Sequence, residues 1–168
     1  MAQIQVGGTP TATVGTLPEV GGPAPAFTLA GEDLNDVVSS SFTGRKLILS
    51  IFPSLDTGVC SMSVRKFNQM AQELDDASVL CVSMDLPFAL GRFCGAEGIK
   101  DAQAASAFRS SFGQDYGVTI AEGPMQGLLS RCVVVIDRGG KVAYTQQVAE
   151  VHDEPDYQAA RQAVEALD

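Results

Sequence analysis

The stretch KLILSIFPSLDTGVCSMSVRKF, from Lys46 to Phe67, decides the fold, because its pattern changes from that of a strand to that of a helix. KLILSIF is a short apolar run that predicts a buried strand, and Pro53 ends it because proline cannot donate to a sheet ladder. From Cys60 onward, apolar residues recur every three or four positions, as on one face of an amphipathic helix. The local order is therefore strand, loop, helix, with Cys60 at the start of the helix.

The segments that follow extend this unit. SVLCVSMD, from Ser78 to Asp85, predicts a second buried strand. Two strands joined by one helix should be parallel, with a right-handed connection. PFALGRFCGAEG, from Pro87, is expected to be a short helical or irregular segment broken by Gly95 and Gly98. DAQAASAFRSSF, from Asp101, is rich in alanine and is predicted to be helical.

The two ends of the chain complete the expected architecture. RCVVVIDRGGKVAYTQQV, from Arg131 to Val148, predicts two strands joined around a pair of glycines. PDYQAARQAVEAL predicts a closing amphipathic helix with Pro155 in its first turn. Residues 1–20 predict an N-terminal β-hairpin. This is the plan of an α/β, thioredoxin-like fold: a mixed central sheet flanked by helices, with an N-terminal β-hairpin extension, in a single domain spanning residues 1–168.

Composition and charge exclude several classes of function. Eleven basic against twenty acidic residues give a formal net charge of −9, which repels nucleic acid and anionic lipid surfaces. No apolar run approaches the length of a transmembrane helix, and the N-terminus lacks the pattern of a secretory signal. Four cysteines are too few for a disulfide scaffold of this size. We therefore expect a cytoplasmic protein with no nucleic-acid or membrane partner.

Cys60 is the candidate nucleophile. A cysteine at a helix N-terminus lies near free backbone N–H groups and the positive end of the helix dipole, which favours its thiolate. Thr57, three residues earlier, stands where a thioredoxin has the first cysteine of its dithiol, and can offer a hydroxyl to the thiolate or to a substrate oxygen. Cysteine hydrolases need a general base, and His152 is the only histidine. Displacement of one peroxide oxygen makes no such demand and leaves a sulfenic acid.

The chain resembles the thiol peroxidases, an atypical two-cysteine branch of the peroxiredoxins. The motifs that carry this resemblance occur in the family's order over essentially the whole chain: PSLDTGVC, SVRKFN, DLPFALGRFCGAEG, YGVTIAEGP, GLLSR and EPDYQAA. The resemblance implies reduction of hydrogen peroxide and organic hydroperoxides, recycling by thioredoxin, and a homodimer with a role in antioxidant defence. It implies no metal, haem, flavin or other cofactor.

The resemblance also implies a role for individual residues. Cys60 would be the peroxidatic cysteine and Cys94 the resolving cysteine of the same subunit. Pro53 would shield the thiolate from water, Thr57 would bond to it or to peroxide, and Arg131 would stabilise the charge of the thiolate and of the transition state. Cys94 lies far from Cys60 in the sequence, so we expect both segments to rearrange when the disulfide forms.

Simpler interpretations apply to the other cysteines. Cys81 is expected to be an inert buried thiol, and Cys132 should point away from the site because it alternates with Arg131 along a strand. Met125, Leu128 and Leu129 could line an apolar mouth that favours alkyl hydroperoxides, or could simply pack in the interior.

Two competing functions remain open from the sequence alone. A thioredoxin-type disulfide oxidoreductase is disfavoured because the close dithiol is missing. A binding module is the second alternative. Zinc binding is disfavoured because the cysteine spacings do not match a zinc site. A peroxide sensor would pass its oxidation to a partner by thiol exchange, so the same sulfenic acid could serve it.

Overall fold

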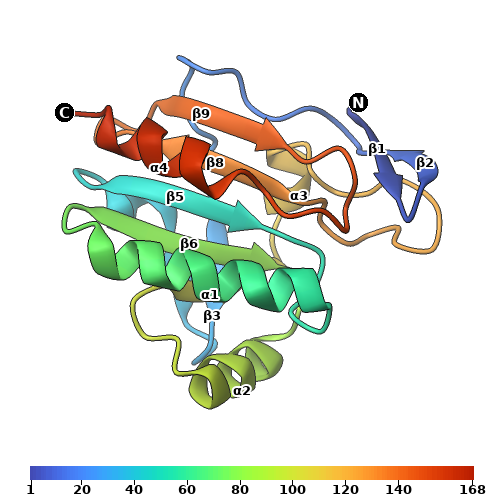
Figure 1. Cartoon of the computed structure of the whole chain (residues 1–168), viewed down its shortest axis with the longest axis horizontal. Helices are drawn as coiled ribbons and strands as arrows, with labels where there is room; N and C mark the ends of the chain where they lie inside the picture. Colours follow the sequence, from blue (N-terminus) through green and yellow to red (C-terminus); the bar gives the residue numbers. More distant parts are fainter.

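The computed structural model describes all 168 residues and is built around one seven-stranded mixed sheet with strand order β4-β3-β7-β6-β5-β8-β9 (Figure 1). A separate two-stranded hairpin, β1-β2, precedes it. The strands are β1 Gln3–Val6, β2 Thr9–Ala12, β3 Thr28–Gly31, β4 Asp36–Val38, β5 Lys46–Ile51, β6 Ala77–Ser83, β7 Gln103–Ser106, β8 Cys132–Ile136 and β9 Val142–Gln147. The helices are α1 Gly58–Glu73, α2 Pro87–Glu97, α3 Phe112–Asp115 and α4 Tyr157–Glu165, with a 3-10 turn at Ser39–Phe42. None of these helices is long and apolar enough to cross a membrane.

The centre of the sheet confirms the strand, helix, strand unit. β5 and β6 pair in parallel, joined by α1, while β8 pairs with β5 in the antiparallel direction. All six residues of β5 are buried, because both faces of the sheet are covered. The predicted β8-β9 hairpin is also present and antiparallel. These results confirm the expected mixed α/β sheet flanked by helices.

Alternate residues of the central strands feed two separate cores. One core lies under α1, α2 and α4 and contains Ile48, Val79 and Val133 from the strands. The other contains Leu49, Leu80 and Val134, together with Phe112 of α3. Figure 1 shows α1 and α4 in front of the sheet and α3 behind it. Since side chains alternate along a strand, each central strand supplies both layers.

The alanine-rich segment is not a helix, so that prediction was wrong. Gln103–Ser106 forms strand β7, which pairs in parallel with β6 and antiparallel with β3. Ala104 faces the first core and Ala105 the second, so small side chains are needed on both sides. Position inside the sheet therefore overrides the helix propensity of alanine.

Three other boundaries differ from the prediction. α2 runs unbroken from Pro87 through Gly95, and Gly98 ends it in the left-handed conformation that glycine adopts easily. α4 begins at Tyr157, capped by the carboxylate of Asp156, so Pro155 precedes the helix instead of opening it. The N-terminal hairpin is present, but its strands end at Ala12, well before residue 20.

Candidate active site

Cys60 lies where β5 leads through a tight turn into α1. Phe52 and Pro53 are buried at the end of the strand, and α1 begins at Gly58 with Thr57 as its N-cap residue. Cys60 is therefore the third residue of the helix, and its side chain has no exposed surface. The first turn of a helix leaves backbone N–H groups without intrahelical partners, so the sulfur lies beside the positive end of the helix.

Thr57 does not cap the helix through its side chain. Its hydroxyl donates to the carbonyl oxygen of Ser54 at 3.1 Å, and its backbone N–H is directed to the same oxygen at 3.3 Å. These bonds close the turn that precedes Cys60. In this arrangement the Thr57 hydroxyl stabilises the turn and has oxygen lone pairs free to accept a further bond.

Arg131 contacts the sulfur of Cys60 from the neighbouring strand. It stands directly before β8 on the face of the sheet that α1 covers, and only 2% of it is exposed. Its Nη2 donates to Cys60 Sγ at 2.9 Å, and its Nε donates to the carbonyl oxygen of Val151 at 2.7 Å. Cys60 is the one cysteine whose sulfur accepts a hydrogen bond from a cationic side chain.

The guanidinium of Arg131 has one group without a partner. Nη1 is buried and makes no hydrogen bond. A buried cation is costly unless it faces an anion, and a thiolate at Cys60 would supply one. The unpaired N–H groups can in addition bind an oxygen atom that enters the site. The arrangement therefore suits a reaction in which negative charge develops on an oxygen beside the sulfur.

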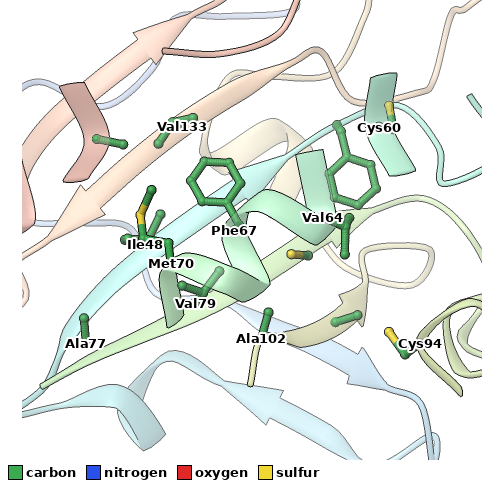
Figure 2. Packing of buried hydrophobic residues seen from close by; sticks show 14 of the residues in the cluster. Ile48, Cys60, Val64, Phe67, Met70, Ala77, Val79, Cys94, Ala102 and Val133 are labelled. Atoms are coloured by element: carbon green, nitrogen blue, oxygen red, sulfur yellow. The ribbon is translucent and has the colours of Figure 1, made fainter. Parts of the chain in front are cut away.

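Cys94 lies on α2 and is not bonded to Cys60. Both cysteines belong to the core under α1, but Figure 2 shows them apart, with Val64 between them in the view. Burial of the side chain, followed by the neighbouring carboxylate of Glu32, raises the pKa of the Cys94 thiol to about 12. Cys94 therefore stays protonated at neutral pH. Of the two cysteines, only Cys60 has a cationic partner, Arg131, on its sulfur.

The other two cysteines are buried in the sheet. Burial first and the neighbouring Cys94 second raise the pKa of Cys81 to about 12. Burial also raises the pKa of Cys132 to about 12, against hydrogen bonds with Ser130 and Gln147. Cys132 belongs to the second core, on the far side of the sheet from Cys60, as its alternation with Arg131 predicted.

Leu129 and Met125 belong to different apolar clusters. Leu129 is fully buried in the second core, which is the interior packing that the sequence had left open as the alternative to an apolar mouth. Met125 packs instead against a small cluster of Ile4, Ile120 and Val151. This cluster includes Val151, whose carbonyl oxygen binds Arg131.

Sequence reasoning missed two groups that support the site. The carbonyl oxygen of Val151 holds Arg131, and no side-chain pattern could have signalled a backbone acceptor. The carboxylate of Asp85 binds the turn before Cys60. Here a signal existed, because a polar residue directly after a buried parallel strand lies at the edge of the sheet where sites form.

Comparisons with known proteins agree with this fold. The Redoxin family matches residues 19–160. A thiol peroxidase from Mycobacterium tuberculosis is 58% identical over 99% of this chain and 100% of its own length, and one from Corynebacterium glutamicum is 55% identical over 98% and 99%. The crystal structure of a peroxiredoxin-like protein from Aquifex aeolicus superposes with a TM-score of 0.95 at 37% identity, covering 100% of this chain and 98% of that chain.

The fold and the buried cysteine and arginine pair define a thioredoxin-like oxidoreductase of the peroxiredoxin type. The chain belongs to the Redoxin family and, within it, to the thiol peroxidases. The expected thioredoxin-like fold and peroxidase class are thus confirmed.

Proposed function

We propose that Cys60 reduces hydrogen peroxide and organic hydroperoxides by direct attack on the O–O bond. The thiolate sulfur bonds to one peroxide oxygen, the O–O bond breaks, and the other oxygen leaves as alkoxide or hydroxide, which takes a proton from solvent. Cys60 becomes a sulfenic acid, and the peroxide becomes an alcohol or water. The hydrogen bond from Arg131 Nη2 to Cys60 Sγ at 2.9 Å carries this proposal.

The surrounding residues act on charge and solvent. Arg131 stabilises the thiolate through Nη2, and its unpaired Nη1 is available to the oxygen that accumulates negative charge. The hydroxyl of Thr57 stays bonded to Ser54, and its free lone pairs can accept a hydrogen bond from the O–H of a bound peroxide. Pro53 is buried at the end of β5 and shields the sulfur from bulk water. None of these steps uses a cofactor.

Cys94 then resolves the sulfenic acid within the same chain. Its sulfur attacks Cys60 Sγ, a disulfide forms, and the sulfenic oxygen leaves as water with the thiol proton. Because Cys94 is buried on α2 and apart from Cys60, the first turn of α1 and the Cys94 segment must rearrange to bring the sulfurs together. Exposure of Cys94 during this movement also removes the burial that raises its pKa.

A thioredoxin-type dithiol closes the cycle by thiol exchange, and the protein works in antioxidant defence and redox homeostasis. The membership in the thiol peroxidases supports this reductant. Four unpaired cysteines suit a cytoplasmic, reducing compartment. We also propose that the protein is a homodimer and that residues 1–168 form a single domain. Light scattering tests the oligomeric state, and limited proteolysis tests the domain organisation.

Coupled turnover tests the roles of the two cysteines. NADPH consumption through thioredoxin reductase and thioredoxin is followed for the wild type, Cys60→Ser and Cys94→Ser, with Cys81→Ser as the control for loss of a buried thiol. We expect Cys60→Ser to abolish turnover, Cys94→Ser to fail in recycling by this route, and Cys81→Ser to remain active. Undiminished peroxide turnover by Cys60→Ser would refute the assignment.

A further inference from the structure

The carboxylate of Asp85 binds three groups at the edge of the sheet. Its Oδ1 accepts a hydrogen bond from Ser54 Oγ at 2.7 Å. Its Oδ2 accepts one from the backbone N–H of Leu55 at 2.8 Å and one from Ser83 Oγ at 2.7 Å. Hydrogen bonds to an ionised carboxylate are roughly twice as strong as those between neutral groups. Asp85 therefore fixes Ser54 and Leu55 against the end of β6.

The parallel pairing of β5 and β6 brings these groups together. Both strands end at the same edge of the sheet, so the turn after β5 lies beside the residues that follow β6. The carbonyl oxygen of Ser54, in turn, accepts both hydrogen bonds from Thr57 at the start of α1. A continuous set of bonds thus runs from Asp85 through Ser54 and Thr57 to the helix turn that carries Cys60.

Asp85 also stands at the entrance of α2, the helix that carries Cys94. Leu86 is the N-cap residue of this helix, Pro87 is its first residue, and the carbonyl oxygen of Leu86 accepts the N–H of Leu90. The same carboxylate therefore joins the turn before Cys60 to the start of the Cys94 segment. These are the two segments that must move for a disulfide to form.

We propose that Asp85 is a positioning residue that holds the Cys60 turn ready for peroxide and must release that turn before Cys60 and Cys94 can join. The inference rests on the proposed function, because it assigns Asp85 opposite effects on the two chemical steps. Attack on peroxide requires the sulfur, Thr57 and Arg131 to be held in place. Disulfide formation requires the same turn to leave this place. Loss of the carboxylate should therefore slow the first step and speed the second.

Stopped-flow kinetics of Asp85→Ala test both effects. The rate constant for oxidation of Cys60 by hydrogen peroxide is measured with Cys94→Ser added, so that the sulfenic acid accumulates. The rate constant for disulfide formation is measured with Cys94 present. We expect the first constant to fall about tenfold to a hundredfold, as for a misplaced reacting group, and the second to rise about threefold to tenfold.

Three further variants show whether the carboxylate itself is responsible. Asp85→Asn keeps one acceptor oxygen and should fall between the wild type and Asp85→Ala in both constants. Ser54→Ala removes the hydrogen bond that Ser54 donates to the Asp85 carboxylate. As in Asp85→Ala, the rate constant for oxidation should fall and the rate constant for disulfide formation should rise. Asp56→Ala is the matched control, because the side chain of Asp56 is exposed in the same turn and only its backbone N–H bonds to Ser54. It should leave both constants unchanged within about twofold.

Amide exchange of the reduced protein gives a readout that needs no peroxide. The N–H of Leu55 is bonded to Asp85, so it should exchange faster in Asp85→Ala, while the amides of β5 keep their protection. Equal exchange at Leu55, or a fall of both rate constants together, would overturn the inference. Absence of a sulfenic acid at Cys60 in the wild-type chain would be a different result, and would contradict the proposed function itself.

Discussion

At the scale of single residues, the proposed reaction with peroxide depends on the contact between Arg131 and Cys60. A guanidinium that is 2% exposed and donates to a sulfur at 2.9 Å is a costly arrangement, and a thiolate at Cys60 would offset that cost. The carbonyl oxygen of Val151 holds the other side of the guanidinium. The position of the cation is therefore set by two bonds, and both come from segments distant in sequence.

Replacement of Arg131 by methionine should leave Cys60 in place but remove its cationic partner. We expect slower alkylation by iodoacetamide and a fall of about 100-fold to 1,000-fold in kcat/KM for peroxide. Arg138→Met is the control, because Arg138 lies on the surface and binds Asp76 instead. A change of less than about threefold in Arg131→Met would argue against a charge-stabilising role.

At the scale of elements, the N-terminal hairpin holds the segment that positions Arg131. The N–H groups of Gly7 and Gly8 donate to the two carboxylate oxygens of Glu150 at 2.8 and 3.0 Å. Both glycines have positive φ, as a two-residue hairpin turn requires. Backbone bonds also join Gln5 to Ala149 and to Val151, so the hairpin lies directly against the acceptor of Arg131.

The stabilisation by Glu150 should depend on pH. Its bonds to the backbone of Gly8 and Gly7 lower its pKa from 4.5 to about 2. A lowered pKa in the folded state means that the stabilisation is fully present above pH 4.5 and is lost as the pH falls toward 2. The difference in free energy of unfolding between wild type and Glu150→Gln should thus shrink over this range in denaturant titrations. Asp153→Asn, in the same loop, should show no such trend, and a pH-independent difference for Glu150→Gln would contradict the explanation.

The elements also show what the sequence could and could not predict. β5, α1, β6 and the β8-β9 hairpin were predictable because each has a strong period and clear ends. β7 could not be predicted, because its four residues QAAS show neither the alternation nor the composition typical of a strand. Only their place between β6 and β3 decides their conformation. Likewise, Cys60 and Arg131 could be selected as site residues from the sequence, whereas the backbone acceptor at Val151 and the bonds of Asp85 required the tertiary structure.

At the scale of the whole molecule, one hydrophobic core contains both candidate redox cysteines. Cys60 and Cys94 belong to the same cluster of 18 buried residues, which α1, α2 and α4 close over the sheet. Packing in such a core is dense, so the proposed disulfide would require local loss of these contacts. Arg65 of α1 and Glu97 of α2 add a surface ion pair between the two helices that carry these cysteines.

The disulfide form should therefore be more open locally than the reduced form. We expect faster amide exchange in the first turn of α1 and along residues 87–98 after oxidation, with unchanged protection in β5 and β6. The rest of the sheet serves as the internal reference in the same experiment. Equal exchange in the reduced and disulfide forms would rule out the rearrangement.

The most direct test of the central claim is the mass of the Cys94→Ser chain after one equivalent of hydrogen peroxide, with dimedone added to trap a sulfenic acid. We expect one dimedone adduct, located on Cys60 by peptide mapping, and none on Cys81 or Cys132, whose buried thiols have a pKa raised to about 12. An adduct on another cysteine, or unmodified Cys60 with the peroxide consumed, would contradict the claim that Cys60 attacks the peroxide.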